Sequence, residues 1–186
     1  MAGLDVPLSG RIAATEQAEP GRVLGRITDL GWGSRLRELV GVTAEGGMAK
    51  DVEVPGPVLS ACVAVLAAWP WAERPTALVG IASVTRPRLT HSLTSGLAEI
   101  GRLEFLGTVN SQGQRPRRAN SAQRLAELWQ RLRLSEELAA AVSSATGPIL
   151  LVDDVIDTGW TVTLATRLLR QAGAKSVLPF ALASTA

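Results

Sequence analysis

The chain has 186 residues, a formal net charge of +2 and a hydrophobic content of 46%. It is long enough for one domain with a buried core and too apolar for a disordered protein. Of its 19 basic residues, all but Lys50 and Lys175 are arginine, whose planar guanidinium suits phosphate or carboxylate partners. An arginine-biased genome would give the same composition. A single cysteine, Cys62, excludes an internal disulfide, so we expect a reducing, cytoplasmic setting.

Neither a secretory signal nor a membrane span is expected. The first 20 residues contain no apolar run flanked by basic residues. The longest apolar run, 57–69, is too short to cross a bilayer and contains Ser60. We therefore expect a soluble protein with no membrane partner.

The elements follow in chain order from apolar spacing, caps and turn signals. Residues 1–20 are polar and aperiodic and predict a tail or linker, with the domain spanning 21–186. Helices are predicted at 27–40, 57–68, 90–101, 121–132, 135–142 and 161–172. Strands are predicted at 77–82, 103–109, 149–152 and 177–183, with loops at 41–56 and 110–120.

Alternating strands and helices predict an α/β fold, an open, mostly parallel, Rossmann-like sheet with helices on both faces. In such sheets ligands bind beyond the carboxyl ends of the strands, on the loops that lead into helices. This rule selects three segments, which are 83–90, 110–120 and 153–161.

The third segment contains two adjacent aspartates at the end of an apolar run, in the sequence ILLVDDVIDTGWT at 149–161. A Walker B strand is excluded because the chain has no G-x-x-x-x-G-K-[ST] motif. A phosphorylated receiver domain is excluded because only 32 residues follow Asp154.

The residues that lead into the following helix favour a phosphate at the helix N-terminus. Gly159 allows close approach of the backbone, and Thr158 and Thr161 add hydroxyl donors. Because carboxylates repel phosphate, Asp153 and Asp154 are expected to face vicinal hydroxyls or a bound Mg²⁺. A sugar phosphate satisfies both requirements.

The same thirteen residues resemble the phosphoribosyl-pyrophosphate signature of the type I phosphoribosyltransferases, in the apolar positions, both acids and the Asp-Thr-Gly-x-Thr loop. The resemblance implies the type I phosphoribosyltransferase fold, with Asp153 and Asp154 on the ribose hydroxyls and 157–161 around the 5′-phosphate. It also implies Mg²⁺, held by the two acids directly or through ribose hydroxyls and water. Trp160 would stack on a base or shield the site. The alternative is a structural turn that caps the helix.

Two arginine-bearing loops lie where this family has its pyrophosphate loop and its mobile catalytic loop. Positive side chains and Mg²⁺ would stabilise the leaving pyrophosphate. The first loop offers Ser83, Thr85, Arg86 and Arg88, and the second offers Arg115, Arg117, Arg118 and Arg124, of which Arg118 is a catalytic candidate. The alternative for both clusters is a solvated surface.

Asp157 is the second catalytic candidate. In hypoxanthine-type transferases an acid at this position faces the base and can accept a proton. Those enzymes also read the purine with a lysine on the following strand, and residues 177–186 contain none. Only 21–56 is available as a base-binding hood. These departures argue against purine transfer.

A narrower resemblance covers about 23–183. LGRITDLGWGSRLREL, AAWPWAERP, the VTRPRL loop and GPILLVDDVIDTGWTVT resemble the phosphoribosyltransferase-like C-terminal domain of actinobacterial RecQ-type ATP-dependent DNA helicases. The pattern around Arg118 and Asn120 is also similar to the competence protein ComF. The chain lacks both Walker motifs and is not itself a helicase motor. The resemblance implies an excised C-terminal domain or a short relative, with DNA as a partner through an attached helicase.

Three functions stay open. The favoured one is a domain that binds phosphoribosyl pyrophosphate or ribose 5-phosphate and serves a DNA-processing protein, as a regulator or a transferase. The second is a stand-alone transferase that acts on a nucleobase or another acceptor. The third is a nucleic-acid-binding module whose arginines at 115, 117, 118 and 124 contact phosphates. Whether transfer is catalysed stays open, as does assembly into a homodimer.

Overall fold

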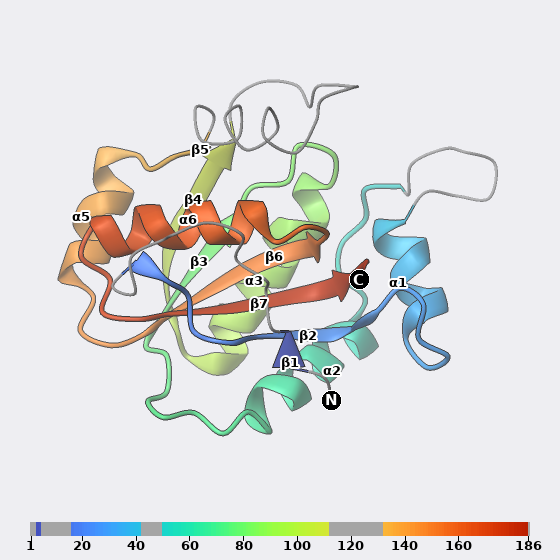
Figure 1. Cartoon of the computed structure of the whole chain (residues 1–186). Coiled ribbons are helices and arrows are strands. Elements are labelled where there is room, and N and C mark those ends of the chain that lie inside the picture. The colour runs from blue at the N-terminus through green and yellow to red at the C-terminus, as the bar shows by residue number, and fades with distance from the viewer. Residues whose placement is uncertain (1–2, 5–15, 42–49, 112–131, 186) are drawn as a thin grey trace.

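The computed structural model describes residues 3–4, 16–41, 50–111 and 132–185 (Figure 1). The helix predicted at 121–132 lies outside these residues except for its last position. The second arginine loop and part of the loop predicted at 41–56 also lie outside them.

Among the described residues, seven strands form one central sheet in the order β1-β2-β7-β6-β3-β4-β5. The contacts between β2, β7, β6, β3 and β4 are parallel, and the short edge strands β1 and β5 are antiparallel to their neighbours. The strands are β1 (Gly3–Leu4), β2 (Gly21–Arg26), β3 (Ala77–Ile81), β4 (Glu104–Ser111), β5 (Leu132–Arg133), β6 (Ile149–Ile156) and β7 (Val177–Ser184).

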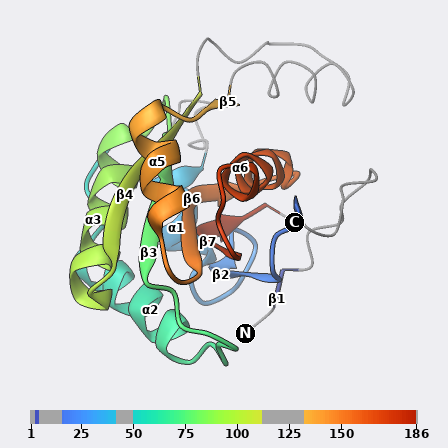
Figure 2. The same cartoon turned by 90° about the vertical axis from the view of Figure 1, so that its left-hand side faces the viewer.

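In the part of the chain that the structure describes, five helices cover both faces of this sheet. They are α1 (Gly33–Val40), α2 (Gly56–Ala67), α3 (Pro87–Gly101), α5 (Glu136–Ser144) and α6 (Trp160–Gln171). Apolar side chains of α1, α2 and α3 join one core cluster, and those of α5 and α6 join the other. Figure 2 shows α2 and α3 on one side of the sheet and α6 on the other. The predicted open, mostly parallel α/β architecture is confirmed.

Close packing of α3 on the sheet depends on a glycine. A β carbon at Gly80 of β3 would lie 3.0 Å from Cγ2 of Thr94 and 3.2 Å from Cγ2 of Thr108. Both threonines would have to move to accept a larger side chain. The glycine therefore fixes how near α3, which begins at the candidate site, lies to β3.

Several boundaries differ from the prediction, among them the start of α3 at Pro87 and the end of β4 at Ser111, and two of the differences have a physical explanation. The helix predicted from residue 27 begins at Gly33, because the backbone N–H of Arg26 donates to Asp29 Oδ2 at 2.8 Å and closes a turn there. The strand predicted to end at residue 152 continues to Ile156, because β7 pairs with it that far, with Ile156 opposite Ser184. The prediction that β6 stops before the two aspartates is wrong.

The sequence pattern also did not predict β2, which lies parallel to β7. Its six residues, GRVLGR, contain two glycines and two arginines, a composition that hides the strand. Glu16 and Glu19, which were predicted to belong to a tail, contact the domain. Glu16 forms an ion pair with Arg167 of α6 at 2.6 Å, and the N–H of Glu19 donates to the carbonyl of Val177 at 3.0 Å.

Candidate functional site

The direction in which successive strands are added to the sheet reverses between β3 and β6, which are adjacent and parallel. From β3 it passes through α3 to β4 on one side, and from β6 it passes through α6 to β7 on the other. The loops after β3 and β6 therefore separate at the carboxyl ends of these two strands, the position where open α/β sheets bind ligands. Because Gly80 pairs with Val152, the loop after β3 leaves the sheet beside the two aspartates.

Asp153 and Asp154 are the two acids at this position, and both lie within β6. Their exposed fractions are 7% and 5%, which is low for charged residues. Oδ1 of Asp153 accepts a hydrogen bond from the N–H of Asp154 at 2.8 Å. Oδ2 of Asp154 accepts from Nε of Arg86 at 2.7 Å. The acid pair is thus held in place by the protein, with a cation from the neighbouring loop against its second member.

The loop after β3 brings some of its predicted residues to the acids and not others. Arg86 is the N-cap residue of α3, its N–H donates to Ser83 Oγ at 3.2 Å, and its side chain is only 12% exposed. Thr85 is exposed. Arg88 points away from the acids and forms an exposed ion pair with Glu53 at 3.5 Å. Ser83 and Arg86 therefore belong to the site as it is folded, whereas Arg88 lies at its rim.

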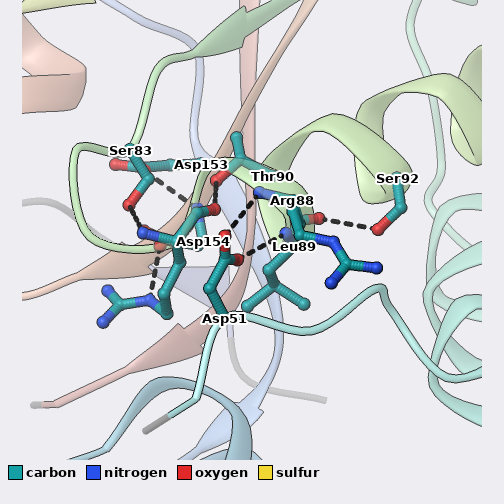
Figure 3. Close-up of polar contacts among 9 residues, drawn as sticks. Asp51, Ser83, Arg88, Leu89, Thr90, Ser92, Asp153 and Asp154 are labelled. Carbon is teal, nitrogen blue, oxygen red and sulfur yellow. Dashed lines mark hydrogen bonds and ion pairs between the residues drawn. The ribbon is translucent and has the colours of Figure 1, made fainter. Parts of the chain in front are cut away.

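A further acid, Asp51, lies at the same loop and was not predicted. Its two carboxylate oxygens accept from the N–H groups of Arg88 and Leu89, both at 3.1 Å, so it caps the first turn of α3 (Figure 3). Nearby, the N–H of Val54 donates to Ser92 Oγ at 2.8 Å. No local spacing could have revealed this cap, because Asp51 is 37 and 38 residues away from the two residues that donate to it.

The loop after β6 leads into α6, whose first residues differ from those of α3. Gly159 has φ of 77° and is the N-cap residue of α6, so the cap position has no side chain of its own. A left-handed backbone at this point favours glycine and turns the first N–H groups of the helix outward. Asp157 and Thr158 are exposed, and Trp160 and Thr161 are half-buried in the first turn. Free backbone N–H groups at the N-terminus of a helix can bind an anion.

Asp157 is also held by the chain. Oδ1 of Asp157 accepts from the Thr185 hydroxyl at 2.6 Å, and the N–H of Thr185 donates to the carbonyl of Ile156 at 3.1 Å. Thr185 was not predicted as a site residue. The register of β6 and β7 explains the contact. Ile156 and Ser184 are opposite each other at the ends of the two strands, and Asp157 and Thr185 are the residues that follow them.

Within the described residues, no three His, Cys, Asp or Glu side chains lie close enough together to hold a metal ion. Asp153 and Asp154 offer hard carboxylate oxygens at the carboxyl end of β6. Mg²⁺ is commonly bound by one or two carboxylates together with water and the phosphates of a ligand. The acid pair fits a Mg²⁺ that arrives with a phosphorylated ligand better than a permanently bound one.

Other predicted features lie elsewhere. Arg115, Arg117, Arg118 and Arg124 fall outside the described residues, so their roles stay predictions.

A mostly apolar hollow of about 320 Å³ lies near the amino ends of the strands, away from the two aspartates. It lies between the C-terminal halves of α2 and α3, with Trp71 and Arg74 in its lining. It contains none of the predicted site residues. In the described part of the chain, no helix has the length and apolar character needed to cross a membrane.

Comparison with known proteins identifies a family for this chain. The sequence profile of the phosphoribosyl transferase domain matches residues 72–183, which include β3, α3, β6 and α6. Among solved structures, the fold is similar to adenine phosphoribosyltransferase from Leishmania tarentolae, with a TM-score of 0.42 and 12% sequence identity over 70% of this chain and 72% of that chain. A search of curated proteins finds no match. Because the profile spans more than half of the sequence, the chain belongs to the phosphoribosyl transferase domain family.

Proposed function

We propose that this domain binds a phosphorylated ribose, phosphoribosyl pyrophosphate or ribose 5-phosphate, with the 5′-phosphate at the N-terminus of α6. The observation that carries the proposal is the left-handed Gly159, which is the N-cap residue of α6 and has no side chain to occupy the first N–H groups of the helix. Backbone N–H groups at such a terminus bind an anion together with the helix dipole. The hydroxyls of Thr158 and Thr161 are the side-chain donors nearest in sequence.

The ribose would lie against Asp153 and Asp154, one loop away from the phosphate. Carboxylates suit hydroxyl groups because each oxygen can accept two hydrogen bonds. Arg86 donates to Oδ2 of Asp154 and so holds the carboxylate in a fixed orientation. Mg²⁺ would join the ligand at these two acids.

Transfer chemistry and biological setting are finer proposals. If the domain is a transferase, Asp157 and Arg118 are the candidate catalytic residues, and pyrophosphate would be released from phosphoribosyl pyrophosphate in the presence of an acceptor. The helicase-associated role rests on sequence resemblance alone, in GWG at 31–33 and WPWAERP at 69–75. A helicase encoded in the same open reading frame would support it.

Calorimetry with ribose 5-phosphate, with and without Mg²⁺, tests the proposal. We expect saturable binding in the millimolar range or tighter, weaker binding of ribose without phosphate, and a loss of about tenfold or more for Asp153→Asn. No heat at millimolar ligand would overturn the proposal. Salt-sensitive DNA binding that disappears when Arg115, Arg117 and Arg118 are changed to alanine, together with no response to ribose 5-phosphate, would instead favour a nucleic-acid-binding module.

A further inference from the structure

The hollow between α2 and α3 has the size of a small-molecule site. Its apolar walls come from both helices and from the sheet, and they include Val63, Leu66, Leu97, Ile100 and Leu150. Ile100 is 54% exposed, so the hollow opens at the surface. Its volume of about 320 Å³ falls within the range of about 300–1,000 Å³ in which small-molecule sites lie.

This hollow is separate from the candidate site at the two aspartates. The helix α3 has 15 residues and begins at the candidate site, whereas the hollow lies at its last residues. At 1.5 Å of rise per residue, the two places are roughly 20 Å apart. A ligand of the hollow therefore does not touch the acid pair of β6.

One wall of the hollow is an indole ring that other rings hold in place. Trp71 stacks on Trp69, with the ring centroids 4.2 Å apart and an angle of 24° between the ring planes. Trp69 is 9% exposed, and the guanidinium carbon of Arg22 lies 5.4 Å from its ring centroid. The N–H of Trp71 donates to the carbonyl of Trp69 at 2.8 Å. The wall is thus formed before a ligand arrives, which reduces the entropy lost on binding.

A single cation lies at this apolar surface. Among the described residues that line the hollow, Arg74 alone is charged. Its Nη2 donates to the carbonyl of Gly101, the last residue of α3, at 2.8 Å. In the described part of the chain this is the one hydrogen bond of the exposed Arg74 side chain, and no carboxylate forms an ion pair with it. A guanidinium has several N–H donors, so Arg74 can donate to an anion at the hollow.

We propose that the hollow binds a small planar apolar acid, with its ring system among the apolar walls beside Trp71 and its carboxylate or sulfonate at Arg74. Burial of the ring system supplies the binding free energy, and the guanidinium selects the anion. A sugar or a nucleotide does not suit this lining, because its hydroxyl groups would lose their hydrogen bonds to water. The inference does not depend on the proposed function.

Fluorescence titration of the full chain with anilinonaphthalene sulfonate, a planar apolar anion, tests the inference. The matched probe is phenylnaphthylamine, which has the same rings and no sulfonate. We expect saturable binding of the sulfonate at one molecule per chain. Arg74→Gln should weaken binding of the sulfonate about tenfold, the size of one hydrogen bond to a charged group, and binding of the uncharged probe less than about twofold.

A second variant blocks the hollow itself. Ala67 is exposed, lies in the last turn of α2 and lines the hollow, so Ala67→Phe should abolish binding of both probes. Ala64→Phe is the control, because Ala64 is an exposed residue of the same helix outside the lining, and it should bind both probes normally.

Four results would overturn the inference. They are no saturable binding to the unchanged chain, normal binding by Ala67→Phe, equal loss of both probes in Arg74→Gln, and displacement of the sulfonate by ribose 5-phosphate. The last would place the probe at the candidate site. Gel filtration adds a further check, since a dimer that Ala67→Phe converts into a monomer would make the hollow an interface between two copies instead.

Discussion

Thr185 donates its hydroxyl to Oδ1 of Asp157 at 2.6 Å and so joins the end of β7 to the first residue of the loop after β6. The loop that would hold the phosphate begins at this carboxylate, and the hydrogen bond restricts its orientation. We expect Thr185→Val to weaken ribose 5-phosphate binding about three- to tenfold, the size of one lost hydrogen bond. Thr185→Ser keeps the hydroxyl and should bind nearly normally. Equal losses in both variants would show that the hydroxyl has no positioning role.

The ion pair between Arg86 and Asp154 should contribute strongly to stability because both side chains are largely buried. Arg86→Ala leaves the Asp154 carboxylate without this partner in a buried position, and such a change costs about 3–5 kcal/mol. Urea unfolding followed by circular dichroism measures it. The matched control is Arg88→Ala in the same loop, whose ion pair with Glu53 is exposed and is worth about 0–1 kcal/mol. Similar losses for the two variants would contradict the assignment of Arg86 to a buried pair.

Gly159 should be required for the geometry of the α6 N-terminus. Alanine at φ of 77° costs about 1–2 kcal/mol and tends to shift the backbone out of the left-handed region. We expect Gly159→Ala to lower the melting temperature and to weaken ribose 5-phosphate binding by about tenfold or more. Gly31→Ala is the control, because a β carbon there meets nothing within 4 Å. Normal ligand affinity in Gly159→Ala would remove the main support for a phosphate site at this helix.

The buried Cys62 thiol should be unreactive in the folded protein. Burial raises the pKa of Cys62 from an ordinary value of 9.0 to about 12, so the reactive thiolate is scarce at mildly alkaline pH. A thiol-specific reagent is expected to label the chain in urea and not in buffer. The folded pKa lies above the unfolded one, so the contribution of this thiol to stability is complete below the unfolded value and decreases as pH rises from 9.0 toward 12. Rapid labelling of the folded chain would contradict the burial of Cys62 in the core.

The sequence alone predicted the elements whose pattern is local. The apolar run at 149–152 predicted the core of β6, and apolar spacing with a proline in the first turn predicted α2 at nearly its observed bounds. The helix after Gly159 was also predicted from the sequence, and the structure places this glycine at its N-cap with φ of 77°. The same local patterns missed β2, whose glycines and arginines hide a strand that lies beside β7.

Only the tertiary structure decided which of the predicted residues meet. Arg86 and Asp154 are 68 residues apart, and they touch because β3 and β6 are adjacent in the sheet. Asp51 and Thr185 belong to no local motif and reach the site only through strand order and the packing of the segment before α2. Periodicity along the chain reports which face of an element is buried, whereas contacts between distant segments depend on how the elements are arranged. The sequence therefore determined the residue chemistry of the loop after β6, and the fold determined that carboxylates already occupy the loop after β3.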